Sequence, residues 1–160
     1  MTALIVNGWT VLAHPLFLEQ YAALLASAID AKSTSSSTFK MSKPAKLLAA
    51  IIHIISEVIP ADPANSAFNQ GKTLGEGATH WKRVKFFQQY RLFYRYDARA
   101  KIIIIAWVND DDTKRAYGSK TDAYRVFRKM LEAGRPPNNW EELLAEARKS
   151  PSLAEVLTEP

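Results

Sequence analysis

The segment at residues 101–108 restricts the possible folds of this chain more than any other part of the sequence. After Lys101 it reads Ile-Ile-Ile-Ile-Ala-Trp-Val, so it is apolar at almost every position. A strand with one solvent-facing side alternates apolar and polar residues, whereas a strand covered on both sides can be apolar throughout. Residues 101–109 are therefore predicted to form the central strand of a sheet.

Two preceding segments, residues 81–87 and 90–96, are also rich in aromatic and β-branched residues and are separated by short connections. This spacing predicts an antiparallel meander that ends in the central strand. An earlier strand is expected at residues 9–13, because an Asn7-Gly8 turn precedes an apolar run there.

Helices are expected before and after these strands. Apolar residues recur at three- and four-residue steps over residues 15–31 and 44–59, and Pro60 and Pro63 are expected to end the second helix. The serine-rich segment 33–40 between them has nothing to bury and is expected to be a flexible loop.

Three helix starts are expected near the C-terminus. Ser119 with Asp122 can form a capping box for a helix that Gly134-Arg-Pro-Pro ends, and further starts are expected at Asn138 and Pro151. The order of elements predicts an α+β fold, with a small antiparallel β-sheet flanked by N-terminal and C-terminal helices. Residues 1–160 are expected to form a single domain, in which residues 138–160 are a C-terminal helical extension.

The composition is typical of a soluble cytoplasmic protein. The longest apolar stretches are far shorter than the roughly 20 residues that span a bilayer, and no basic and apolar secretory signal opens the chain. The absence of cysteine excludes a disulfide framework and a thiolate metal site, and it is consistent with a reducing compartment.

The positive charge is concentrated in one stretch. Residues 80–130 contain thirteen Lys/Arg and five Asp/Glu, a local net charge of +8, whereas residues 1–79 are balanced and residues 131–160 carry −3. Such a distribution is typical of a surface that binds polyanions. A solvated basic face without a ligand is the alternative at this point.

Side chains alternate across a strand, so Arg83 and Lys85 share one face, as do Arg91, Phe93 and Arg95 on the next strand. Up to four cations are therefore expected to converge, and a bound phosphate would relieve their mutual repulsion. Interleaved aromatic rings offer faces on which bases of single-stranded RNA can stack: Tyr90, Phe93, Tyr94 and Tyr96.

A metal-dependent nuclease has little support in the sequence, and no metal or other cofactor is expected. Asp110-Asp111-Asp112 is the only group of carboxylates, and three adjacent loop residues rarely converge on one ion. A loop or helix-start role is the alternative for these acids. The three histidines lie in separate predicted elements, which disfavours a two-histidine mechanism: His14, His53 and His80.

Metal-free attack by the 2′-OH of RNA on the adjacent phosphate remains. It requires charge stabilisation and positioned proton donors and acceptors. Lys85 and Tyr117 are the candidates for proton transfer, because positive neighbours favour the deprotonated forms of lysine and tyrosine in general. The candidates for holding the phosphate are Arg83, Arg91 and Arg115. Further RNA contacts are expected from Lys82, Arg95, Tyr94, Lys120 and Tyr124.

The sequence resembles the YhaV toxin family over about residues 6–140. The number and order of the matching segments carry this resemblance: Val6-Asn-Gly-Trp9, Ala13-His-Pro15, Arg83-Val-Lys-Phe86, Tyr90-Arg-Leu-Phe-Tyr-Arg-Tyr96, Trp107-Val-Asn-Asp110, Tyr117-Gly, Lys120-Thr-Asp-Ala-Tyr124 and Gly134-x-Pro-Pro-x-x-Trp140.

The resemblance places the chain in the wider RelE/ParE group and implies a small antiparallel sheet flanked by helices. It also implies endoribonuclease activity on mRNA, free or on the ribosome, which inhibits translation and growth. A PrlF-type antitoxin that binds operator DNA is the implied partner.

In the RelE pattern, two basic residues on one strand, an arginine on the next, and a later arginine and tyrosine act on RNA. In sequence order these roles fall on Arg83, Lys85, Arg91 and Tyr117. The spacing from Tyr117 places Asp111 where the later arginine is expected, so either Arg115 takes this role or the role is absent. The loop between Lys85 and Arg91 is also one residue shorter than the pattern.

A non-catalytic protein is the alternative. It would be a ParE-like toxin that acts on a protein target, or a DNA-binding co-repressor that acts with its antitoxin. The clustered cations favour the nuclease, because an inhibitor of a protein has no need for a cationic cluster of phosphate size.

Overall fold

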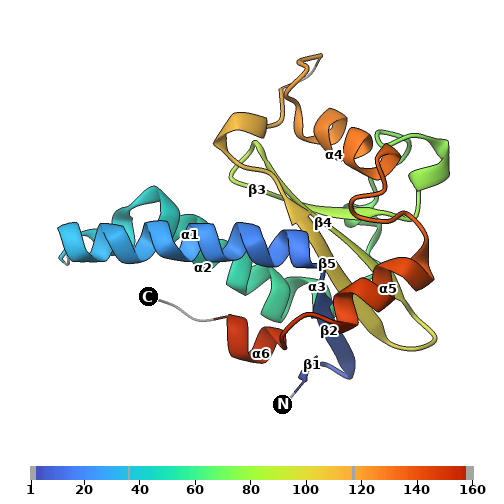
Figure 1. Ribbon diagram of the computed structural model, residues 1–160, viewed down its shortest axis with the longest axis horizontal. Helices are drawn as coiled ribbons and strands as arrows, with labels where there is room; N and C mark the ends of the chain where they lie inside the picture. Colours follow the sequence, from blue (N-terminus) through green and yellow to red (C-terminus); the bar gives the residue numbers. More distant parts are fainter. Residues whose placement is uncertain (1–2, 36, 117, 158–160) are drawn as a thin grey trace.

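The computed structural model describes residues 3–35, 37–116 and 118–157. At its centre is a five-stranded sheet in the order β1-β2-β5-β4-β3 (Figure 1). The strands are β1 (Leu4–Val6), β2 (Trp9–Ala13), β3 (Lys82–Phe86), β4 (Tyr90–Asp97) and β5 (Ile102–Val108). The α+β class is confirmed.

The sheet is mixed rather than antiparallel throughout. β2 runs parallel to β5, whereas the other neighbouring pairs are antiparallel. α1, α2, α3 and the β3–β4 hairpin separate β2 from β5 in the chain, so no tight turn forces these two strands to be antiparallel. β1 was not predicted; it pairs with β2 through the turn at Asn7 and Gly8, whose φ angles of 53° and 82° suit a tight hairpin.

β5 is the central strand, as predicted, and all seven of its residues are buried. Ile103 and Ile105 belong to one hydrophobic core, whereas Ile102, Ile104 and Ala106 belong to a second core. This division follows from the two-residue repeat of a strand. The uninterrupted apolar run in the sequence therefore reflects a strand that is covered on both faces.

The helices lie on both sides of the sheet (Figure 1). α1 (Pro15–Thr34), α2 (Lys43–His53) and α3 (Ile59–Ala61) cover one side, and the π-helical segment Ile54–Val58 joins α2 to α3. α4 (Ala123–Glu132) and α5 (Trp140–Arg148) cover the other side. α6 (Leu153–Val156) returns to the first core through Leu153.

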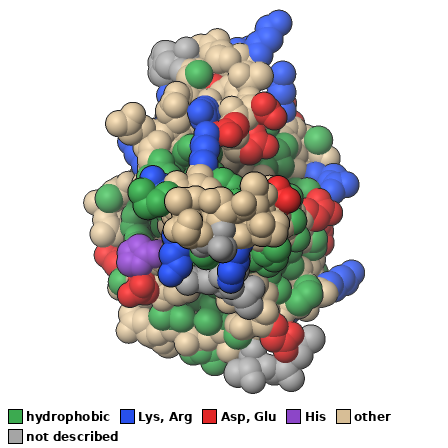
Figure 2. Space-filling view, turned by 90° about the vertical axis from the view of Figure 1, so that its left-hand side faces the viewer, with side chains coloured by type: hydrophobic (Ala, Val, Ile, Leu, Met, Phe, Trp, Pro, Cys, Tyr) green, Lys and Arg blue, Asp and Glu red, His purple; other side chains and the backbone are tan. Residues whose placement is uncertain are grey.

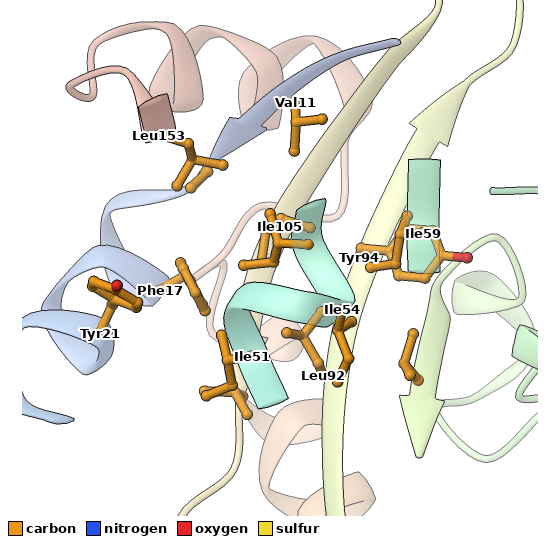
Figure 3. Packing of buried hydrophobic residues seen from close by; sticks show 14 of the residues in the cluster. Val11, Phe17, Tyr21, Ile51, Ile54, Ile59, Leu92, Tyr94, Ile105 and Leu153 are labelled. Carbon is orange, nitrogen blue, oxygen red and sulfur yellow. The ribbon is translucent and has the colours of Figure 1, made fainter. Parts of the chain in front are cut away.

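The first core lies between the sheet and the α1–α3 group (Figure 3). Phe17 of α1 and Ile51 of α2 are buried there against Leu92 and Ile105 of the sheet. The second core fixes α4: Phe127 stacks on Phe93 with ring centroids 4.4 Å apart. This stacking sets the position of the preceding helical turn, which carries Tyr124.

The ends of several elements differ from the prediction by a few residues. Asp122 alone caps α4, because its side chain accepts from the N–H of Tyr124, whereas Ser119 Oγ accepts from Thr121. Asn139, not Asn138, caps α5. Asn138 is engaged elsewhere, since its amide accepts from Trp81 Nε1 and donates to the carbonyl of Gly77.

Regular structure also extends further than expected around the first two helices. Residues 33 and 34 form the end of α1, and Phe39–Met41 forms a 3-10 turn, so helical structure reaches both ends of the segment expected to be a loop. Ser36 of that segment lies outside the described residues. The second helix continues one residue past Pro60.

The helical stretch Lys43–Ala61 is long and apolar enough to cross a membrane, with 19 residues and a mean hydropathy of 1.5. This stretch was not predicted from the length of its apolar runs, because polar residues such as Lys46 and His53 interrupt them. The mean hydropathy of the stretch is nevertheless 1.5. Its apolar side chains pack into the first core. They include Leu48, Ile51, Ile54, Ile55 and Ile59, and 33% of the stretch is buried.

Candidate functional site

Three arginines from different segments meet at the side chain of Tyr124. The Nε–H groups of Arg83 on β3 and Arg91 on β4 both donate to the Tyr124 hydroxyl oxygen, at 2.9 and 3.1 Å. The guanidinium of Arg115 lies 4.7 Å from the centre of the Tyr124 ring. We call Arg83, Arg91, Arg115 and Tyr124 the arginine cluster.

The register of the β3–β4 hairpin brings two of these arginines together. Lys85 lies opposite Arg91, and Arg83 lies opposite Phe93, so these side chains share the face that α4 covers. Phe93 contacts the Tyr124 ring edge-on at 5.6 Å. The short loop between Lys85 and Arg91 is a tight turn, and it places the two residues directly across from each other.

Arg83 and Arg91 are almost fully buried and donate only to uncharged oxygens among the described residues. Nη1 of Arg83 donates to the carbonyl of Ala67, and Nη1 of Arg91 donates to the carbonyls of Gln88 and Tyr90. Neither arginine forms an ion pair with a described carboxylate. A buried charge without a counter-ion is unfavourable, so an anion that binds here would stabilise the cluster.

Arg115 is held differently, by the buried carboxylate of Asp122. Arg115 Nη1 lies 2.7 Å from Asp122 Oδ1, which also accepts from the N–H of Ala116 at 2.7 Å. Asp122 Oδ2 accepts from the N–H of Tyr124 at 3.1 Å. The Asp122 carboxylate therefore fixes the loop that contains Ala116, the start of α4 and the side chain of Arg115.

Asn109 joins the segment after β5, at Thr113, to the β3–β4 hairpin, at Gln89 and Arg91. It is buried at the end of β5, and its Oδ1 accepts from the N–H of Arg91 at 2.6 Å. Its Nδ2 donates to the carbonyls of Gln89 and Thr113, both at 2.9 Å. Neither Asn109 nor Asp122 was predicted as a site residue; Asp122 was predicted only to help cap a helix, and both lie beside predicted site segments.

The remaining predicted site residues lie in several places. Lys85 is exposed on the face of the arginine cluster, and Lys120 is exposed in the loop before α4. Lys82 lies on the opposite face of β3, next to Asn69, and burial lowers its pKa. Tyr117 lies outside the described residues.

Tyr94 and Arg95 are both engaged inside the fold. Tyr94 is fully buried on the opposite face of β4, where its hydroxyl donates to the carbonyl of Pro63 and burial raises its pKa. The expectation that an RNA base stacks on Tyr94 is therefore wrong, because its ring has no exposed surface. The guanidinium of Arg95 lies 5.5 Å from the Trp81 ring and 5.3 Å from the Trp140 ring, and burial lowers its pKa to about 10.

The acidic and histidine residues do not gather at one point. Within the described ranges, no group of three or more His, Asp or Glu residues could hold a metal ion. Asp110 caps the 3-10 turn Asp111–Thr113, and Asp111 binds Lys43 and the Tyr90 hydroxyl. His14 pairs with Glu146 at 2.8 Å, and His53 pairs with Glu57 at 2.8 Å; His80 bonds to Asn138 at 2.9 Å.

The basic excess of the chain is not spread over every surface. At the end of the molecule formed by the α1–α2 connection, Lys and Arg side chains are interspersed with Asp and Glu (Figure 2). Ion pairs between exposed side chains also occur, Lys43 with Asp111 and His53 with Glu57. The arginine cluster is different, because two of its three arginines have no carboxylate partner among the described residues.

Comparison with known proteins identifies relatives of this chain. Residues 11–148, which include the whole arginine cluster, match the YhaV toxin family, described as a toxin with endonuclease activity, of toxin-antitoxin system. The chain is 46% identical over 147 residues to "Ribonuclease toxin YhaV" of Escherichia coli K12 and to "Toxin YhaV" of Escherichia coli O157:H7. Each alignment covers 91% of this chain and 96% of the relative. No solved structure matches significantly. This chain therefore belongs to the YhaV family of toxin–antitoxin toxins with endonuclease activity.

Proposed function

We propose that the protein is a metal-independent endoribonuclease that cleaves mRNA at the arginine cluster and thereby inhibits translation and growth. The observation that carries this proposal is the convergence of Arg83, Arg91 and Arg115 on Tyr124, with two of the guanidinium groups lacking a described counter-ion. The name of the relative from Escherichia coli K12, a ribonuclease toxin, supports RNA as the substrate.

In the proposed reaction the 2′-oxygen of a nucleotide attacks the adjacent phosphorus, and the bond from phosphorus to the 5′-oxygen breaks. One proton leaves the 2′-OH and one reaches the departing 5′-oxygen, so the products are a 2′,3′-cyclic phosphate and a 5′-OH end. The arginines hold the phosphate and stabilise the charge that develops on its oxygens. Lys85 and Tyr117 are proposed to transfer the protons.

Not every RNA contact proposed from the sequence fits the structure equally well. Lys85 and Lys120 are exposed and can reach a bound strand. Lys82 and Arg95 are proposed to contribute through long-range attraction, since Lys82 lies on the far face of β3 and Arg95 is packed between two tryptophans. Tyr124 contributes by organising the arginines rather than by stacking, because it is only 6% exposed.

We further propose that the toxin acts in the cytoplasm, either on free mRNA or on the ribosome. Its partner is proposed to be a PrlF-type antitoxin, and the complex of the two is proposed to bind operator DNA. The family description supports an antitoxin partner, since it names a toxin–antitoxin system.

The test is to incubate purified protein with end-labelled RNA, with and without ribosomes, and with and without EDTA. We expect cleavage in EDTA and fragments with 2′,3′-cyclic phosphate and 5′-OH ends. Fragments with 5′-phosphate ends, or activity lost in EDTA and restored by magnesium, would rule out the proposed mechanism. RNA binding without cleavage under every condition would instead favour a non-catalytic, ParE-like toxin or a DNA-binding co-repressor.

A further inference from the structure

The arginine cluster depends on two side chains at the start of α4. Tyr124 accepts from Arg83 and Arg91, and Asp122, the N-cap residue, binds Arg115. We propose that Asp122 and Tyr124 are positioning residues for RNA cleavage, which fix the three arginines in one arrangement before the phosphate binds. This inference rests on the proposed function.

The Tyr124 hydroxyl fixes two guanidinium groups at once. An accepting phenol oxygen has two lone pairs, and here both receive an Nε–H group. The Nη1 atoms of Arg83 and Arg91 are also bonded to backbone carbonyls. Within the described residues, the Nη2 atoms of these two arginines have no acceptor, so they remain available to a phosphate.

Asp122 performs the same task for Arg115. Asp122 is 4% exposed, and its carboxylate contacts Arg115 Nη1, the N–H of Ala116 and the N–H of Tyr124. The bond to Arg115 holds that guanidinium over the Tyr124 ring at 4.7 Å. A carboxylate beside a phosphate-binding cluster repels the phosphate. Its presence there is therefore explained by positioning rather than by RNA binding.

Fixed donors stabilise a transition state better than mobile ones, because their reorganisation does not add to the barrier. Loss of either positioning residue should therefore slow cleavage more than it weakens RNA binding. Loss of a direct contact with RNA would instead lower the affinity for RNA. Loss of a purely structural residue would lower the stability of the protein.

The experiment compares Asp122→Asn, Asp122→Ser and Tyr124→Phe with the parent protein. Asp122→Ser keeps a residue that can cap α4 but removes the charged partner of Arg115. Asn139→Ala is the matched control for a lost helix cap, because Asn139 caps α5 away from the cluster. Tyr94→Phe is the matched control for a lost buried hydroxyl, because Tyr94 lies on the opposite face of β4. Thermal unfolding checks that each variant is folded.

Single-turnover cleavage should fall about 10- to 100-fold in all three test variants, as expected for misplaced catalytic groups. RNA dissociation constants should stay within about 3-fold of the parent value, because the arginines themselves are retained. The two control variants should cut at rates within about 3-fold of the parent. Parent-like rates in the test variants, or equal losses in the controls, would overturn the inference.

A double variant tests whether Asp122 acts through Arg115. If it does, Asp122→Asn in an Arg115→Ala background should slow cleavage by no more than about 3-fold beyond Arg115→Ala alone. Independent roles would instead multiply the two single effects, and that outcome would overturn the assignment of Asp122.

A readout without RNA separates this inference from the proposed function. In NMR spectra, the Nε–H signals of Arg83 and Arg91 should shift and exchange faster with water in Tyr124→Phe than in Tyr94→Phe. Unchanged signals would show that Tyr124 does not hold these arginines. If the parent protein does not cut RNA, the proposed function fails, while these spectra still test whether the cluster is organised by α4.

Discussion

The Nε–H group of Arg91 donates to the hydroxyl oxygen of Tyr124 at 3.1 Å, and this bond joins β4 to α4 across the candidate site. The stacking of Phe127 on Phe93 holds α4 against the same strand. The orientation of Arg91 is thus set by the packing of the second core, so a bound phosphate would meet a guanidinium that is already in place.

Replacing Arg91 by Ala should slow cleavage strongly. The change removes a charged donor whose contact strengthens as the transition state forms, so we expect a loss of about 2–4 kcal/mol, or about 10²–10³ in rate. Single-turnover kinetics on labelled RNA measure this effect. Arg99→Ala is the control, because Arg99 is exposed in the turn between β4 and β5; a loss of the same size in that variant would mean that overall charge, not the cluster, determines the rate.

Replacing Tyr117 by Phe tests the proposed proton transfer. The ring is kept and only the hydroxyl is lost, so RNA affinity should barely change while cleavage falls by about 10²-fold or more. The half-buried Tyr96, which packs against Trp9, provides a matched Tyr→Phe control. Cleavage at the parent rate in Tyr117→Phe would assign the proton transfer to Lys85 or to water.

Replacing Asn109 by Ala should destabilise the protein. The change leaves the N–H of Arg91 and the carbonyls of Gln89 and Thr113 without their side-chain partner in a buried setting. We expect the free energy of unfolding to fall by about 2–4 kcal/mol, measured by urea denaturation. Asn65→Ala, at an exposed helical cap, should cost about 1 kcal/mol or less. Equal losses in both variants would contradict the role assigned to Asn109.

The ion pair of Asp111 should make a small, pH-dependent contribution to stability. Hydrogen bonds from Lys43 and Tyr90 hold the pKa of Asp111 below its ordinary value of 3.8. A group with a lowered folded pKa stabilises the fold above its unfolded pKa, and this contribution disappears as the pH falls through the folded value. The melting temperature of Asp111→Asn should therefore lie slightly below that of the parent at pH 7, and the two should converge in acid.

The matched control for this measurement is Asp112→Asn, since Asp112 has no cation partner within the described residues. The effect is expected to be small because Asp111 is 58% exposed and solvent screens the pair. A difference between parent and Asp111→Asn that grows as the pH falls would contradict the sign of this prediction.

Binding of the antitoxin should protect part of the basic region. Residues 80–130 carry a net charge of +8, which an acidic or apolar partner segment can cover. Hydrogen exchange with and without the antitoxin should show protection within these residues or in the helices that flank them. Protection confined to residues 1–60 would show that inhibition acts from elsewhere on the molecule.

The sequence alone predicted β2 to β5, the main helices and the shared face of Arg83, Lys85 and Arg91, although it missed β1. The apolar run in β5 predicted a central strand because both of its faces must be covered by other parts of the chain. Alternation along β3 and β4 placed Arg83, Lys85 and Arg91 on one face, since strand geometry has a repeat of two. These features depend on neighbouring residues in the chain, so a single sequence contains them.

The tertiary structure decided how the arginines are held. Asp122 is 31 residues from Arg91, and Tyr124 is 41 residues from Arg83, so no local pattern links these side chains. Tyr94 and Arg95 were predicted to contact RNA because they are aromatic and basic, but packing from other elements covers both. The parallel pairing of β2 with β5 likewise joins segments that are far apart in the chain. Contacts between distant segments depend on how whole elements pack, and this information becomes available only when the chain is folded.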